Sequence, residues 1–526
     1  MRPHLERLGA FLPAAVALAL PTLYIPIAVD SFILPRAAIV VAAACIGAGV
    51  ALLTPGGPRL GALRWPLVAA AAAAIVATLF SISPALSVAG SYTRYESLPV
   101  RLAYLGLLAF PVWLIRGETA RRFVAPAFVF GTSVACLEAL GQWAGHVPFR
   151  PDGNLGNANL LAALVAMAFP VAVARGLRGG NLVVAWWLAI AVMIATLVVV
   201  TSRSGALGAL VGTLALAVCA ARGRWRRATL GGSAAVLAFA GLVVLRSPLS
   251  TLNDDPLSLR LHLWQDGLRM IIARPITGWG LDTTGLAFGR FLSSDYASLV
   301  TFDRIHSGPL DIAATQGVLG LAALGWVVCL TLRGGWRNRF KGDAAALTAA
   351  LVGYSVWVLA NFDWAPATGA FWLLCGTAWS AVRAAETGSA GQTDVLAAAA
   401  GSTWWRSGLA VGLGLAALPL GALPMLADIW YSQNRADLAV RVDPLQARYH
   451  WSLGEGLVAL GDTQRGVAEM QRAAELGETE PSLYVELGDT QLKLGRKSQA
   501  RDDYGQALAI DPFYTPASQR LASLGS

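Results

Sequence analysis

The chain has 526 residues, of which 56% are hydrophobic and only 13% charged, and its mean hydropathy is +0.57. Soluble globular proteins carry roughly 25% charged residues, so this composition excludes a wholly water-soluble protein. The formal net charge is +9 at pH 7, but the basic residues lie in short segments between apolar runs. That placement indicates membrane orientation and argues against nucleic-acid binding.

Apolar runs of about 20 residues, the length that crosses a bilayer as a helix, recur over the first four-fifths of the chain. We predict an all-α protein with two parts: a polytopic transmembrane domain, residues 1–430, and a small helical solenoid, residues 431–526. The domain has about 12–13 expected spans, a number that follows from the lengths of the runs. They are predicted at 9–29, 33–53, 63–80, 98–115, 123–143, 158–174, 182–200, 205–221, 228–245, 309–331, 345–362, 366–384 and 407–428.

The arginines fall mainly in alternate connections between these spans. One set of connections includes the N-terminus and the segments 59–64, 116–122, 175–178, 222–227 and 333–341; the short connections of the other set hold little more than Arg36, Arg94, Arg150 and Arg203. The positive-inside rule therefore predicts that the N-terminus lies in the cytoplasm. With an odd number of spans, the helical tail lies outside.

Candidate functional residues on the outward side begin with Arg94, in G-S-Y-T-R, followed by Asn157 and Asn159 at the outer mouth of the sixth span. The two amides can hydrogen-bond a sugar, or they can cap the helix that follows. Arg203 lies in a very short turn, T-S-R-S-G. A cation so close to the bilayer normally faces a partner or a watery cavity, and the alternative is that it extends to the lipid headgroups.

The longest outward connection, residues 246–308, contains R-L-H-L-W from Arg260 and D-R-I-H from Asp303. We predict short amphipathic helices here on the outer membrane surface, with Trp264 and Trp279 at the depth of the headgroups. Arg260 and Arg304 lie on the same face as the earlier arginines. Convergent guanidinium groups suit a phosphorylated lipid, because each presents a planar fork that can bind two phosphate oxygens.

His306 closes the D-R-I-H sequence immediately before the tenth span. An unperturbed histidine titrates near pH 6.5, the region suited to a base that deprotonates a hydroxyl. The alternative is a hydrogen-bonded histidine that orients the loop. The five cysteines all lie within apolar runs, so the sequence predicts neither a disulfide nor a metal site. We expect no cofactor.

The tail repeats with a period of 34 residues from Asp443 onward: Leu453-Gly454 corresponds to Leu487-Gly488, and Ala473 corresponds to Ala507. Small residues at these positions let two antiparallel helices pack closely. The second copy resembles a tetratricopeptide repeat. Such repeats can form a groove for a protein partner, or they can serve as a cap or a dimer contact.

The motifs, taken in order, resemble the O-antigen ligase and polymerase superfamily. The resemblance runs from about Ser81 to Trp372 through G-S-x-x-R, G-N-x-N, S-R-S-G, R-x-x-x-W, R-P-x-x-G-W-G and D-R-x-H. It implies a glycosyltransferase of the bacterial inner (cytoplasmic) membrane with an undecaprenyl-diphosphate-linked glycan as donor. By motif, Arg203 and Arg260 are implied to bind the diphosphate and His306 to lie near the acceptor. Ser307 departs from the family pattern, which usually has asparagine after the histidine.

We therefore favour metal-independent transfer of a lipid-linked glycan to an acceptor hydroxyl on the outer face. Arg203 and Arg260 would stabilise the leaving diphosphate, and His306 would take the proton of the acceptor. The residues expected to bind substrate are Arg94, Arg304, Asp303, Asn157, Asn159 and Trp264. The sequence leaves open whether the acceptor is a glycan, a lipid or a protein, and so whether the reaction is ligation, polymerisation or protein glycosylation.

Two other classes of function are alternatives for a polytopic chain of this kind. A bicarbonate-carrier-like transporter is opposed by the absence of an inverted repeat and by polar residues that gather on one face, since carriers bind substrate near the bilayer midplane. A non-catalytic membrane scaffold that presents its repeats to a partner is the second alternative.

Overall fold

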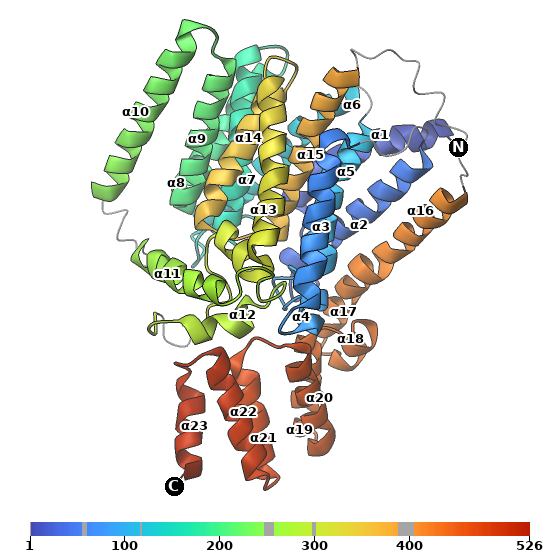
Figure 1. Ribbon diagram of the computed structural model, residues 1–526, viewed down its shortest axis with the longest axis vertical. Helices are drawn as coiled ribbons and strands as arrows, with labels where there is room; N and C mark the ends of the chain where they lie inside the picture. Colours follow the sequence, from blue (N-terminus) through green and yellow to red (C-terminus); the bar gives the residue numbers. More distant parts are fainter. Residues whose placement is uncertain are drawn as a thin grey trace.

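The computed structural model describes residues 2–54, 60–115, 118–246, 257–296, 301–387 and 404–525. Over these residues the chain is all-helical and contains no strand (Figure 1). Eight helices within the described ranges are long and apolar enough to cross a membrane. The predicted fold class, a polytopic bundle of membrane helices, is confirmed.

A helix lies at each of the predicted spans, and most of these helices run side by side from one end of the bundle to the other (Figure 1). They are α1 (Arg2–Thr22), α2 (Ile33–Leu53), α3 (Arg64–Leu79), α5 (Leu98–Leu114), α6 (Glu118–Ala144), α7 (Ala158–Arg178), α8 (Val183–Val200), α9 (Arg203–Ala220), α10 (Arg224–Arg246), α13 (Gly308–Arg337), α14 (Ala344–Trp357), α15 (Ala365–Thr387), and α16 (Trp404–Ala417) continued by α17 (Leu423–Ser432).

Helix α7 forms the centre of the bundle, because nearly all its side chains are buried and it packs against α8, α9 and α14. Small residues make this close packing possible. A Cβ added to Gly353 of α14 would lie 2.4 Å from the carbonyl oxygen of Ala166 in α7, which leaves no space for any side chain. The tight contact holds α14 directly against α7.

A loop interlocks with a break in α13. Gly317 has a φ of 66° and interrupts the helix, so carbonyl and amide groups next to it have no partner within α13. The loop after α11 (Leu257–Ala273) supplies those partners: Trp279 N–H donates to the Ala314 carbonyl at 2.8 Å, and Val318 N–H donates to the Pro275 carbonyl at 2.8 Å. The outward segment is thereby held against the bundle.

The headgroup depth predicted for Trp264 and Trp279 stays a prediction, and the structure shows that Trp279 is buried within the protein. Its side chain is 7% exposed and its Nε1–H donates to the Met270 carbonyl at 2.9 Å. Trp264 is half-buried, and its Nε1–H donates to the His306 carbonyl at 3.2 Å. Both indole N–H groups have found backbone partners inside the protein, so the aromatic residues of α11 and of the following loop build a small core.

The tail consists of successive helices beyond the end of the bundle where α11 and α12 (Thr284–Ala287) lie (Figure 1). They are α18 (Ala436–Val442), α19 (Ala447–Ala459), α20 (Thr463–Leu476), α21 (Pro481–Lys493), α22 (Lys497–Ile510) and α23 (Thr515–Gly525). Corresponding helices, α19 and α21 or α20 and α22, begin 34 residues apart, which is the period of the sequence. Helices α19 to α23 share an apolar core, whereas Ala439 of α18 packs with Ala427 of α17 and Tyr449 of α19. The boundary near residue 430 and the tetratricopeptide assignment stay predictions.

Polar contacts tie the tail to the membrane part. Asp428 of α17 accepts hydrogen bonds from Tyr92 at 2.6 Å and from Tyr449 of α19 at 3.2 Å. Gln446 Nε2 donates to the Gly90 carbonyl at 3.3 Å. Because Tyr92 and Gly90 belong to the segment that also carries Arg94, the tail is anchored on a segment that leads into the site described below.

The side of the membrane on which the tail lies is directly testable. A cysteine at Lys493, which is exposed, should react with an impermeant maleimide in intact spheroplasts, because the arginine pattern puts the tail outside. A cysteine at Lys341, exposed at the opposite end of the bundle, is the matched control and should react only after lysis. Both changes are made in a Cys329→Ala background, since Cys329 is exposed. The reverse labelling pattern would overturn the predicted topology.

Candidate functional site

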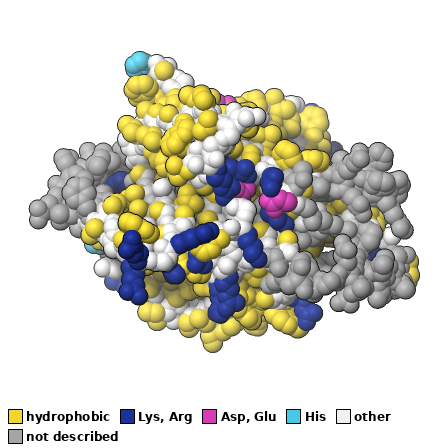
Figure 2. All heavy atoms as spheres, turned by 90° about the horizontal axis from the view of Figure 1, so that it is seen from above, with side chains coloured by type: hydrophobic (Ala, Val, Ile, Leu, Met, Phe, Trp, Pro, Cys, Tyr) yellow, Lys and Arg dark blue, Asp and Glu magenta, His cyan; other side chains and the backbone are white. Residues whose placement is uncertain are grey.

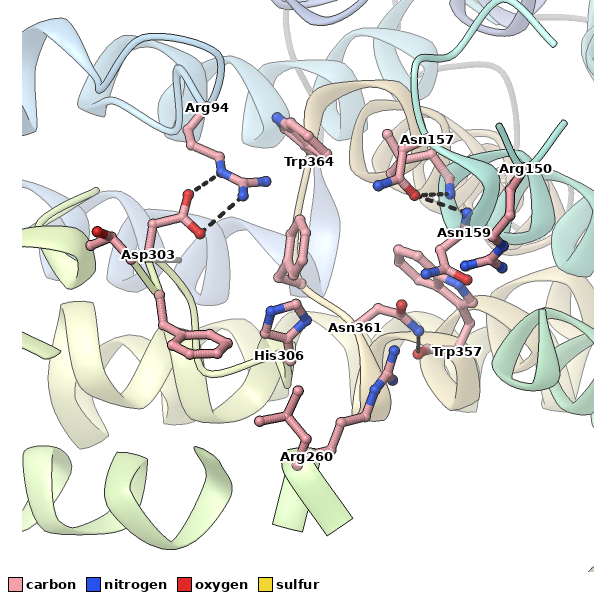
Figure 3. Close-up of a pocket in the computed structure, with 15 residues that line it drawn as sticks. Arg94, Arg150, Asn157, Asn159, Arg260, Asp303, His306, Trp357, Asn361 and Trp364 are labelled. Carbon is pink, nitrogen blue, oxygen red and sulfur yellow. Dashed lines mark hydrogen bonds and ion pairs between the residues drawn. The ribbon is translucent and has the colours of Figure 1, made fainter. Parts of the chain in front are cut away.

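A cavity of about 470 Å³ lies where the outward segment meets the ends of the membrane helices (Figure 3). It is formed by the segment before α5 that carries Arg94, the α6–α7 connection, the start of α7, helix α11, the loop before α13, the end of α14 and the α14–α15 connection. The lining residues are Arg94, Arg150, Asn157, Asn159, Leu160, Leu259, Arg260, Thr301, Phe302, Asp303, His306, Trp357, Asn361, Phe362 and Trp364. Cations, amides and aromatic rings from segments far apart in the sequence therefore share one space.

Two arginines occupy one side of the cavity. Arg260 of α11 is 8% exposed and donates through Nη1 to the Ala360 carbonyl. Arg150 donates through Nη2 to the Val200 carbonyl at 2.9 Å, and within the described part of the chain its buried Nε has no hydrogen-bond partner. Backbone carbonyls accept hydrogen bonds from both guanidinium groups, each of which carries a positive charge. This side of the cavity is therefore suited to an anion.

Amides of the cavity wall are braced by the turn that begins α9. Ser202 Oγ donates to Asn159 Oδ1 at 2.8 Å, and Asn361 Nδ2 donates to Ser204 Oγ at 2.9 Å. Arg203 stands between these two serines, half-buried, but it is not among the residues that line the cavity. The turn therefore supports the wall. Asn157 Oδ1 accepts a hydrogen bond from Asn159 N–H at 2.8 Å. Asn157 therefore caps the start of α7, which is one of the two roles that the sequence predicts for it.

His306 lies between the Arg94–Asp303 pair and the group formed by Arg260 and Asn361 (Figure 3). Its ring packs edge-to-face on Phe362, with centroids 5.2 Å apart and an interplanar angle of 80°. Its backbone has a φ of 59°, a left-handed conformation that a non-glycine residue adopts only when its surroundings hold it there. The bond from Trp264 to the His306 carbonyl is one such restraint, so we assign Trp264 to positioning the histidine.

Arg94 and Asp303 form a two-bond ion pair at the other side of the cavity, with Arg94 Nη2 donating to Asp303 Oδ1 at 2.9 Å. The guanidinium also stacks over the rings of Trp364, at 4.3 Å, and Phe362, at 4.8 Å. Burial raises the pKa of Asp303, but the charges of Arg94 and Arg304 outweigh it, so the pKa falls below its ordinary value. Asp303 therefore stays ionised at neutral pH, and the pair is close to neutral.

Arg304 points away from the cavity. It is 4% exposed, forms an ion pair with Asp282 and is not a lining residue. Burial lowers the pKa of Arg304, but the carboxylates of Asp282, Asp303 and Asp311 raise it above the ordinary value of arginine. Asp282 also accepts from Ser91 N–H at 2.7 Å. Through Asp282, Arg304 thus connects the loop that carries His306 to the segment that carries Arg94, and its role in the structure is to hold these two segments together.

A buried polar network lies behind the aromatic wall. Arg101 of α5 pairs with Asp363 at 2.7 Å and with Glu96 at 3.2 Å, and Tyr104 donates to Glu96 at 2.7 Å. Burial raises the pKa of Glu96 to about 6, although Arg101 acts in the opposite direction. Because Asp363 lies between the two lining residues Phe362 and Trp364, this network fixes the rings that face the cavity.

The sequence prediction of the site does not include several of the lining residues, and two of the segments that carry them are informative. From the sequence, Arg150 is only one of the outward arginines, and N-F-D-W, which starts at Asn361, lies at the boundary between two predicted spans. Both segments nevertheless carry a sequence feature that indicates a functional site. Arg150 is a cation outside the basic set of connections, and N-F-D-W is a polar and aromatic cluster between two apolar helices. Each of these features indicates residues that face a hydrated cavity and not the lipid.

Residues 188–325 match the family model described as O-antigen ligase. This segment runs from α8 into α13 and includes Arg203, Arg260, Asp303 and His306. No curated protein matches the chain. The family match supports membrane glycan transfer as a general class of function. Within the described ranges, no three His, Cys, Asp or Glu side chains are grouped so that they could hold a metal ion.

Proposed function

We propose that this chain transfers a glycan from an undecaprenyl-diphosphate-type lipid to an acceptor hydroxyl on the outer face of the bacterial inner membrane. The observation that carries the proposal is the placement of His306 in one cavity between a cationic side and an aromatic side. The match of residues 188–325 to the O-antigen ligase model supports the general class of reaction. The proposed sidedness rests on the arginine pattern of the connections between the spans.

The cationic side would take the diphosphate of the donor. Arg150 and Arg260 converge there, and the amides of Asn159 and Asn361 add hydrogen-bonding groups beside them. As the bond between the anomeric carbon and the diphosphate oxygen breaks, negative charge grows on that oxygen. Preorganised cations in a partly dehydrated cavity stabilise such charge strongly, because little reorganisation is needed at the moment of reaction.

The aromatic side would take the acceptor. Phe302, Phe362 and Trp364 offer flat apolar faces against which a sugar ring or an apolar segment can pack. The acceptor oxygen would attack the anomeric carbon while His306 accepts its proton, and the lipid diphosphate would leave. The Arg94–Asp303 pair, nearly neutral overall, would hydrogen-bond neighbouring hydroxyls and would not compete for the diphosphate.

Arg203 has a more peripheral place in this scheme than Arg260. We retain it as a donor contact at the edge of the site, because it begins α9 between serines that brace two cavity amides. Arg203→Lys keeps the charge but loses the bidentate fork, so transfer should fall at least about tenfold, or ~1.4 kcal/mol. The measurement is the transfer rate at equal protein level. An unchanged rate would instead assign Arg203 to orientation at the lipid headgroups.

The test of the function is reconstitution. The purified full chain in nanodiscs is incubated with an undecaprenyl-diphosphate-linked glycan and, in separate arms, with a lipid, a glycan and a peptide acceptor that carry free hydroxyls. We expect product in one arm and release of undecaprenyl diphosphate, both followed by mass spectrometry. A donor that binds but transfers to none of these acceptors, together with bicarbonate uptake into proteoliposomes, would favour the transporter.

A further inference from the structure

The opposite end of the bundle carries a second cationic cluster, formed by the α9–α10 turn and the end of α13. Arg226 lies over the ring of Trp336 at 4.6 Å, and Arg339 lies over the same ring at 4.5 Å. Arg339 also lies over Phe340 at 4.4 Å, and Arg222 shares that ring at 4.6 Å. Two shared rings therefore bring three guanidinium groups together. Stacking on aromatic faces reduces the cost of this arrangement but does not cancel the charge.

No acidic side chain pairs with these three arginines within the described residues. The acids at this end are already engaged: Asp343 pairs with Arg175 and Arg178, and Glu118 pairs with Arg121 and Arg122. The Nε atoms of Arg226 and Arg339 are buried, and among the residues described they have no hydrogen-bond partner. Figure 2 shows this face with many more basic than acidic side chains among those described. An anion bound between these three guanidinium groups would offset the repulsion of their positive charges.

The surroundings of the cluster indicate that the anion belongs to a lipid. Trp225 is 66% exposed and Phe340 is 47% exposed, so aromatic rings lie open beside the cations. The cluster stands at the ends of the apolar helices α9 and α13, both candidate membrane spans. Cations with exposed aromatic rings at the end of a span are typical of the interface between hydrocarbon and headgroups, where basic pockets between helices bind anionic lipids.

We propose that Arg222, Arg226 and Arg339, with Trp336 and Phe340, bind the headgroup of an anionic phospholipid. The phosphate would accept hydrogen bonds from the guanidinium groups, and the acyl chains would lie along the exposed apolar surfaces of α9 and α13. The headgroup would also stabilise α10, whose Arg226 stacks on α13 and whose other described side chains are mostly exposed. This binding site is separate from the outward cavity and independent of the proposed transfer reaction.

The test compares two double variants of the full-length chain in detergent. Arg226→Gln/Arg339→Gln removes two cations of the cluster. Arg64→Gln/Arg406→Gln removes two cations whose stacking partners are their own neighbours, Trp65 at 4.3 Å and Trp405 at 5.6 Å. The probes are phosphatidylglycerol, phosphatidylcholine and inorganic phosphate. Lipid retention is measured by native mass spectrometry and stability by thermal unfolding.

We expect the wild type and the Arg64/Arg406 variant to retain phosphatidylglycerol and to be stabilised by it. The Arg226/Arg339 variant should bind this lipid about tenfold more weakly, the size expected for loss of a charged hydrogen bond. If that variant does not fold, Arg222→Gln, which changes an exposed side chain, should show the same weakening. Equal retention by wild type and cluster variants, equal binding of phosphatidylcholine, or full stabilisation by inorganic phosphate alone would overturn the proposal.

Discussion

His306→Ala is expected to slow glycan transfer by about 10²–10⁴-fold while donor affinity stays nearly unchanged, which is the usual effect of removing a general base. The reason is the position of the ring, which packs on Phe362 and lines the cavity together with Arg260 and Asp303. Transfer rate and donor affinity are measured on the same preparation, the latter by calorimetry with the lipid-diphosphate glycan.

The pH profile separates a base from an orienting residue. A base must be unprotonated, so the wild-type rate should be full at high pH and fall as the pH drops through the histidine pKa, about 6.5 when unperturbed. The alanine variant should lose this dependence. His262→Ala is the matched control, because His262 stacks on Tyr296 and does not line the cavity. Weakened donor binding, or an unchanged pH profile, would assign His306 to loop orientation and move the search for the base to Asp303 or Asp311.

Arg260→Ala is expected to weaken donor binding by about 1.5–3 kcal/mol, roughly 10–150-fold, the range for hydrogen bonds to charged groups. The reason is geometric: Arg260 is nearly buried and lines the cavity together with Arg150 and Asn361. Removing it leaves the charge of the diphosphate less compensated. The measurement is calorimetric titration with the lipid-diphosphate glycan.

Arg269→Ala provides the control for Arg260, since Arg269 is on the same helix, is 58% exposed and pairs with Asp266. It should leave donor affinity unchanged. Arg260→Lys should recover part of the lost affinity, because it restores charge without the planar fork. If Arg260→Ala binds donor as well as the wild type does, the diphosphate is not held on this side of the cavity. Arg150 would then also lose its proposed role.

The sequence by itself determined the architecture of the bundle. Apolar runs of bilayer length specify helices wherever they occur, because a backbone in hydrocarbon must satisfy its hydrogen bonds within one segment. The 34-residue period likewise predicted the spacing of the tail helices, since the small residues that set it are requirements of helix packing. Arginines outside the basic set of connections predicted a functional site on the outward side. In the structure, Arg94, Arg260, Asp303 and His306 line one cavity.

What each of those cations faces was decided only by tertiary structure. In the sequence, Arg94 and Arg304 are both outward arginines with the same predicted role. In the structure, Arg94 lines the cavity, whereas Arg304 forms a buried ion pair with Asp282. Trp279, which resembles an interfacial anchor, is buried because its loop hydrogen-bonds to the backbone of α13 next to the break at Gly317. Arg150 joins the site through packing of segments distant in the chain. Periodicity encodes which face of a helix is apolar, but the partner of a charge depends on which segments the packing brings within a few ångströms.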